Sequence, residues 1–216
     1  MKITTLSIFA VGSLIATTAM ADYTGLSQEA VDNGDGTWTS RIFANFDAET
    51  DELDAVFGDA DNVLHITSSH GFYQNDFGGA TSADINPALY SAFPSLVMDS
   101  WVTIGLEDQV DNNMLNIGID FADFEDNGGD IYTDNGTWFA TPDDAQVLAG
   151  ADLRVMIGQF TMYGLESRVS GVINIQGKAG DFETFQEREI VFDFELPAPG
   201  ALALLGIAGL AQRRRK

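Results

Sequence analysis

The chain of 216 residues contains no cysteine and only two histidines, His65 and His70. Disulfides, thiol catalysis and thiolate metal ligands are excluded, because each needs a cysteine sulfur. The two histidines stand five positions apart with no H-E-x-x-H motif, so a zinc site is not expected. The Gly-x-Ser-x-Gly turn of many serine hydrolases is also lacking. We therefore expect that the protein is not an enzyme.

Basic residues are scarce between Asp22 and Glu195. This stretch holds all 33 acidic residues but only five of the ten basic ones, so its net charge is −28, against −23 for the whole chain. Such a surface repels the phosphates of nucleic acids and excludes them as partners, while it attracts cations. The 15 Phe, 5 Tyr and 3 Trp nevertheless supply more core than a disordered acidic chain carries.

Residues 1–21 have the three parts of a secretory signal peptide. Met1-Lys2 is a positive n-region, residues 6–15 are apolar, and Ala19-Met20-Ala21 fits the small-x-small cleavage rule. The apolar stretch is shorter than the roughly 20 residues of a membrane span. We expect a signal helix that is removed after export.

Residues 196–216 combine a proline break, a short apolar run and a basic end. Pro197-Ala198-Pro199 ends the preceding strand, since proline removes backbone donors. Ala201 to Ala211 predicts a hydrophobic helix, but as a helix it spans only about 16 Å, roughly half the hydrocarbon thickness. Arg213-Arg214-Arg215 and Lys216 should stay cytoplasmic. The tail is therefore expected to anchor the chain only transiently.

This tail resembles the PEP-CTERM sorting signal, which consists of a Pro-Glu-Pro-like motif, a short hydrophobic helix and an arginine cluster. Ala198 stands where that family usually has glutamate. The resemblance implies export in a Gram-negative bacterium that makes exopolysaccharide, with transient anchoring in the inner membrane. It also implies processing by an exosortase-like enzyme, after which the protein is at the cell surface or extracellular. Residues 93–106 and 134–139 are similar to stretches of uncharacterised proteins with the same tail.

Residues 22–195 show the period-two alternation of half-buried strands. Asn33-Gly34, Asp35-Gly36 and Asn135-Gly136 supply the residues that tight turns require. One short helix is expected at 85–92. We predict a single all-β domain, an antiparallel β-sandwich with jelly-roll-like connectivity. The expected strands are 37–46, 53–57, 63–68, 100–106, 114–119, 153–162, 171–177 and 189–195.

Acidic clusters with oxygen ligands suggest calcium as a cofactor. Asp32 and Asp35 lie in a glycine-rich loop, but the twelfth position from Asp32 is Phe43, so the loop is not an EF-hand. Asp47 and Asp51 belong to a second cluster. These four aspartates are the candidate calcium ligands, and solvated acidic loops are the alternative interpretation.

Sugars bind against flat aromatic platforms, and Tyr73, Trp101 and Trp138 could furnish one. Both tryptophans lie in strand patterns, however, where an aromatic side chain is more often part of the core. The function expected is a non-catalytic interaction within the exopolysaccharide layer. Two alternatives are a carbohydrate-active hydrolase with paired carboxylates and a calcium-dependent carbohydrate-binding module.

Overall fold

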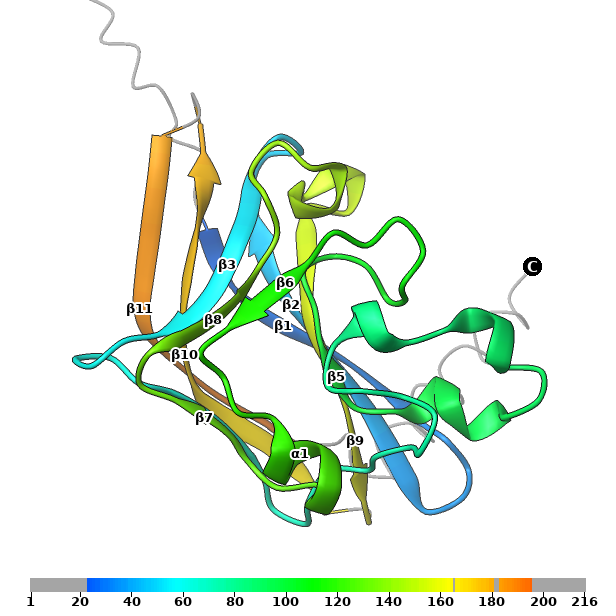
Figure 1. Cartoon of the computed structure of the whole chain (residues 1–216). Coiled ribbons are helices and arrows are strands. Elements are labelled where there is room, and N and C mark those ends of the chain that lie inside the picture. Colours follow the sequence, from blue (N-terminus) through cyan, green and yellow to red (C-terminus); the bar gives the residue numbers. More distant parts are fainter. Residues whose placement is uncertain (1–22, 165, 181–182, 196–216) are drawn as a thin grey trace, which may run out of the picture.

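The computed structural model describes residues 23–164, 166–180 and 183–195. The expected signal helix and the sorting tail with its hydrophobic helix lie outside the described residues. The described part consists mostly of antiparallel strands in two sheets (Figure 1). Among these residues, no helix is long and apolar enough to cross a membrane.

Four strands form the first sheet, which we call sheet A. β2 is its centre because it pairs with β1 on one side and with β9 on the other. The β1–β2 hairpin turns at Gly34 and Gly36, both with positive φ, as the Asn-Gly and Asp-Gly pairs predict. In spatial order the strands are β1 (Tyr23–Asp32), β2 (Thr37–Phe46), β9 (Arg154–Tyr163) and β5 (Trp101–Val102).

Seven strands form the second sheet, sheet B. The long strand β10 organises it: β11 pairs with one edge, while β4 and β3 share the other. Within the described residues, β10 is the one strand with which β11 pairs. The strands are β6 (Leu115–Ile117), β8 (Gly136–Phe139), β3 (Glu52–Gly58), β10 (Arg168–Ala179), β4 (Leu64–Ser68), β7 (Ile131–Thr133) and β11 (Glu183–Glu195).

The main core lies between the two sheets. Sheet A contributes Trp38, Ile42 and Phe160, and sheet B contributes Val56 and Trp138, each at most 2% exposed. These residues come from the inward-facing positions of their strands, because successive side chains of a strand point to opposite faces. The sandwich is therefore held together by burial of apolar surface.

A second core cluster covers the other face of sheet A. Phe43, Trp101 and Met156 of the sheet pack against Ile85 and Leu96. The last two belong to the segment 82–98, which Figure 1 shows in green beside β5. The strands β2 and β9 of sheet A are thus covered on both faces, whereas the edge strand β1 is not. The outer face of sheet B is left for contact with solvent. The segment contains the 3₁₀ turns Ser82–Asp84, Pro87–Leu89 and Pro94–Met98.

Most expected strands are confirmed, but two expectations are wrong. The helix at 85–92 is only the 3₁₀ turn Pro87–Leu89, and the strand at 100–106 is reduced to Trp101–Val102. Gly105 has φ +76°, and its backbone turns against the carbonyl of Gln146, so the strand ends early. The elements that the sequence did not suggest are β1, β7, the helix α1 (Ala122–Asn127) and the 3₁₀ turns Ser82–Asp84, Pro94–Met98, Ala145–Val147 and Gly150–Asp152.

Candidate functional site

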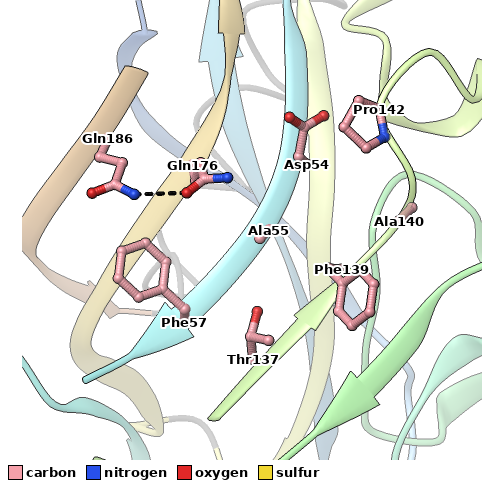
Figure 2. A pocket seen from close by; sticks show the side chains of 9 residues that line it. All are labelled: Asp54, Ala55, Phe57, Thr137, Phe139, Ala140, Pro142, Gln176 and Gln186. Atoms are coloured by element: carbon pink, nitrogen blue, oxygen red, sulfur yellow. Dashed lines mark hydrogen bonds between the residues drawn. The ribbon is translucent and has the colours of Figure 1, made fainter. Parts of the chain in front are cut away.

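Two adjoining hollows lie on the outer face of sheet B. The larger has a volume of about 440 Å³ and the smaller about 330 Å³, and both are lined by Phe57 and Thr137. We call the two together the outer groove. Figure 2 shows Phe57 and Phe139 on either side of Thr137 in the larger hollow. The larger hollow is also lined by Asp54, Ala55, Ala140, Pro142, Gln176 and Gln186, and the smaller by Gly58, Ile117, Gly118, Asn135 and Gly136.

One row of paired residues crosses five strands of this face, and its four members from Phe139 to Gln186 line the larger hollow. Pairing places Leu115 beside Phe139, Phe139 beside Ala55, Ala55 beside Gln176, and Gln176 beside Gln186. At about 4.8 Å between strands, this row is about 19 Å long. Ala55 is the smallest side chain of the row and stands in its middle. The larger hollow lies where Ala55 leaves room between its bulkier neighbours.

Alternation along the strands explains why these side chains face outward. In β8, Thr137 and Phe139 flank Trp138, which is fully buried. In β3 the register to β10 shifts between Ala55 and Leu53, so Asp54 is an extra residue in the strand. This bulge brings Asp54 to the wall of the groove.

The groove offers apolar surface and amide groups rather than cations. Gln186 Nε2 donates a hydrogen bond of 2.6 Å to Gln176 Oε1, which fixes the two amides side by side (Figure 2). The Arg188 guanidinium lies 5.1 Å from the centre of the Phe57 ring and forms an ion pair with Asp59. Among the described residues that line the two hollows there is no lysine or arginine.

Asp54 is the ionisable group of the groove. It is 4% exposed, and its Oδ1 atom finds no hydrogen-bond partner among the described residues. Burial raises the pKa of Asp54 to about 6, and the charge of Glu52 adds to the effect, while the Lys178 ammonium opposes it. Lys178 Nζ lies 3.5 Å from Glu52 Oε2 and 3.3 Å from Asp143 Oδ1. Asp54 is therefore a carboxyl group that changes protonation near neutral pH.

The paired carboxylates Glu52 and Asp54 are close enough to share a hydrogen bond, which contributes to the raised pKa of Asp54. Glycosidases hold their two carboxyl groups about 5–9.5 Å apart, so that the sugar carbon or a water fits between them. A directly hydrogen-bonded pair leaves no such space. The arrangement thus suits ligand contact better than glycoside hydrolysis.

The four calcium candidates fall into two separate places. Asp32 and Asp35 lie at the β1–β2 turn, and Asp47 and Asp51 lie in the β2–β3 connection, with the ten residues of β2 between them. Asp35 Oδ1 accepts hydrogen bonds from the Thr37 backbone and hydroxyl. In the described ranges, no group of three or more His, Cys, Asp or Glu side chains is placed to hold a metal ion. Calcium binding stays a prediction, which thermal unfolding with calcium or EDTA tests.

The aromatic platform expected from Tyr73, Trp101 and Trp138 does not form. Trp138 is fully buried and donates its indole N–H to the Thr103 carbonyl at 3.0 Å, and Trp101 is 2% exposed. A buried ring face cannot stack on a sugar, so the two tryptophans are core residues, as the alternative interpretation held. Tyr73 alone is partly exposed, on a loop against the end of β9.

Sequence reasoning missed the groove residues Ala55, Phe57, Phe139, Gln176 and Gln186. For two of them, Phe57 and Phe139, the sequence does carry a signal, because each phenylalanine stands next to a core residue of its strand and so faces outward. No family model, curated protein or solved structure matches the chain. A function must therefore be inferred from the groove itself.

Proposed function

We propose that the chain is an exported, non-catalytic polysaccharide-binding protein of the cell surface or extracellular matrix, and that the outer groove holds its ligand. The observation that supports this most is the row from Phe139 to Gln186, in which aromatic and amide side chains line a hollow surface. A volume of about 440 Å³ lies within the range of small-molecule sites.

The chemistry of the groove matches the two kinds of surface of a sugar. Phe57 and Phe139 offer apolar ring surface for the C–H faces of the pyranose. The amides of Gln176 and Gln186 offer donors and acceptors for hydroxyl groups. The lining residues from Phe139 to Gln186 cross four strands, a distance of about 14 Å. That length suits an extended chain better than a single ring.

The charge of the domain favours an uncharged polymer. Residues 22–195 carry a net charge of −28, and the groove wall contains Asp54 but no cation among its described residues. An anionic polysaccharide would meet repulsion from the domain, and the nearby Arg188 guanidinium beside Phe57 is already paired with Asp59. Neutral polysaccharide is therefore the proposed ligand class.

Export and sorting belong to the same proposal and rest on residues 1–21 and 196–216. Cleavage of the signal peptide, transient anchoring in the inner membrane and processing by an exosortase-like enzyme would deliver the domain to the exopolysaccharide layer.

The jelly-roll connectivity of the sandwich likewise stays a prediction.

Two groove variants test the proposal. Ala55→Leu fills the middle of the row, and Phe139→Ala removes one of its aromatic faces. We expect each to weaken binding of the producing bacterium's purified exopolysaccharide at least tenfold in calorimetric titration, which corresponds to about 1.4 kcal/mol. Tyr132→Ala is the matched control, because Tyr132 is an exposed aromatic of sheet B outside the groove. Wild-type affinity in both groove variants would overturn the proposal.

The same polymer distinguishes binding from hydrolysis. After prolonged incubation with the wild-type protein, we expect unchanged chain length and no new reducing ends. Release of reducing ends that Asp54→Asn abolishes would instead favour the hydrolase with paired carboxylates.

A further inference from the structure

A third hollow, separate from the outer groove, lies at the loop that follows β4. It has a volume of about 270 Å³ and shares no lining residue with the outer groove. We call it the loop pocket. Its lining residues are Tyr73, Gln74, Asn75, Asp76, Phe77, Phe93 and Ser95.

Hydrogen bonds hold this loop in a fixed shape. The Tyr73 backbone N–H donates to the Thr161 carbonyl of β9 at 2.7 Å. The buried carboxylate of Asp99 accepts from the backbone N–H groups of Asn75, at 2.7 Å, and Gly79, at 3.1 Å. The loop pocket is therefore preformed, which lowers the entropy lost when a ligand binds.

The walls of the loop pocket combine aromatic and amide groups. Phe77 is 47% exposed and stacks on Phe93 with ring centres 3.7 Å apart. Asn75 Nδ2 donates to the Tyr73 hydroxyl at 3.1 Å and to Ser95 Oγ at 3.0 Å, which orients both hydroxyl groups. This is the same chemistry as in the outer groove, on a smaller scale.

Gln74 supplies the observation that points to a ligand. Both its amide atoms are buried, and neither meets a hydrogen-bond partner in the part of the chain that the structure describes. Unsatisfied buried polar groups are rare and unfavourable. Rotation of this side chain toward a ligand breaks no hydrogen bond with the described residues. Adjacent hydroxyl groups of a sugar would satisfy both the donor and the acceptor of the amide.

We infer that the loop pocket is a second sugar-binding site, for a single uncharged sugar unit, and that the domain cross-links polysaccharide chains. This inference rests on the proposed function of the outer groove. The two sites lie against different sheets, since the loop pocket is tied to β9 of sheet A and the outer groove belongs to sheet B. One domain could thus hold two chains at once, and many domains would join chains into a network.

Light scattering of the full chain with the producing bacterium's exopolysaccharide tests the inference. The wild type should raise the scattering to a maximum at an intermediate ratio of protein to polymer, because excess protein occupies sites singly. The double variant Gln74→Ala/Phe77→Ala should lose this rise while its calorimetric titration keeps binding at the groove within about threefold of wild type. Tyr132→Ala should behave as the wild type in both measurements.

The outcomes separate the inference from the proposed function. If the loop variant cross-links the polymer as well as the wild type does, the second site is wrong while the groove proposal stands. If the groove variants Ala55→Leu and Phe139→Ala bind as well as the wild type, the groove proposal fails. An unfolding midpoint within a few degrees of wild type confirms that each variant is folded, and NMR shifts of the Gln74 side-chain amide on adding a short exopolysaccharide fragment report the second site directly.

Discussion

Asn174 Oδ1 accepts a 2.9 Å hydrogen bond from the backbone N–H of Glu189, across a bulge between β10 and β11. The Asn174 amide also donates to the carbonyls of Phe57 and Asn62, at 2.9 and 2.8 Å. One fully buried side chain thus satisfies three backbone groups where β3, β4 and β11 meet along β10. These contacts support the strands that carry the outer groove.

Asn174→Ala should therefore be strongly destabilising. The substitution leaves an N–H group and two carbonyls without their partner, and we expect a loss of about 2–4 kcal/mol in the free energy of unfolding. Urea denaturation followed by circular dichroism measures this loss. An Asn174→Ala protein as stable as wild type would show that these backbone groups find other partners.

Glu189 itself should tolerate glycine better than any larger residue. Its φ of +53° is unfavourable for a residue with a Cβ atom, whereas glycine adopts it readily. We expect Glu189→Gly to stabilise the fold by about 0.5–1 kcal/mol and Glu189→Val to destabilise it, since a β-branched residue is least suited to this region. Equal unfolding midpoints for the two variants would contradict the role given to the backbone here.

Stability should fall as the pH rises through the pKa of Asp54. The folded-state pKa of about 6 exceeds the ordinary value of 3.8, so the folded state binds the proton more tightly than the unfolded one. The resulting stabilisation is fully present below about pH 4 and is lost as the pH rises through 6. Asp54→Asn removes the ionisation, and the variant should exceed wild type in stability by about 2 kcal/mol at pH 8. Parallel stability profiles for the two proteins between pH 4 and 8 would contradict this.

Glu125 on α1 should show the same behaviour in a different part of the fold. Burial raises its pKa to about 7, and the charges of Asp99, Asp84 and Asp126 add to the shift. Its contribution to stability is present below about pH 4.5 and disappears as the pH rises through 7. Glu125→Gln should therefore match wild type at pH 5 and be more stable by about 1–2 kcal/mol at pH 8. Thermal unfolding at the two pH values measures the difference.

The tryptophan fluorescence should not respond to polysaccharide through direct stacking. Trp38, Trp101 and Trp138 are each at most 2% exposed. We expect blue-shifted emission and weak quenching by iodide, both unchanged when exopolysaccharide is added. Strong iodide quenching that the polymer relieves would instead restore a tryptophan platform as the binding surface.

Strand β2 illustrates which parts of the fold the sequence alone predicts. Trp38, Ile42 and Phe46 stand at even-numbered positions of the strand predicted over 37–46, and all three are buried in the core between the sheets. The alternation is visible because the opposite face of this strand carries mostly polar side chains, namely Thr37, Thr39, Arg41 and Asn45. The loss of the strand after Val102 was not predictable, since it depends on the contact between Gly105 and Gln146, 41 positions away.

The outer groove depends on pairings that sequence spacing does not reveal. Ala55 lies beside Phe139 and Gln176, which are 84 and 121 positions further along the chain. The alternation around Phe57 predicts a strand, but it does not predict which strands pair with it. The bulge at Asp54, which brings a carboxyl group to the groove, has no local sequence signal such as glycine or proline.

Among the described strands, only β10 pairs with β11, so the other side of β11 is free to pair with a second molecule at high protein concentration. A long strand at the edge of a sheet is a template for pairing with a second molecule. Here the thirteen residues of β11 include five acids, so two such edges would bring like charges together. At neutral pH this repulsion keeps neighbouring molecules from stacking into fibrils. Acid that protonates these carboxylates would weaken the repulsion, so edge-to-edge pairing should become easier as the pH falls.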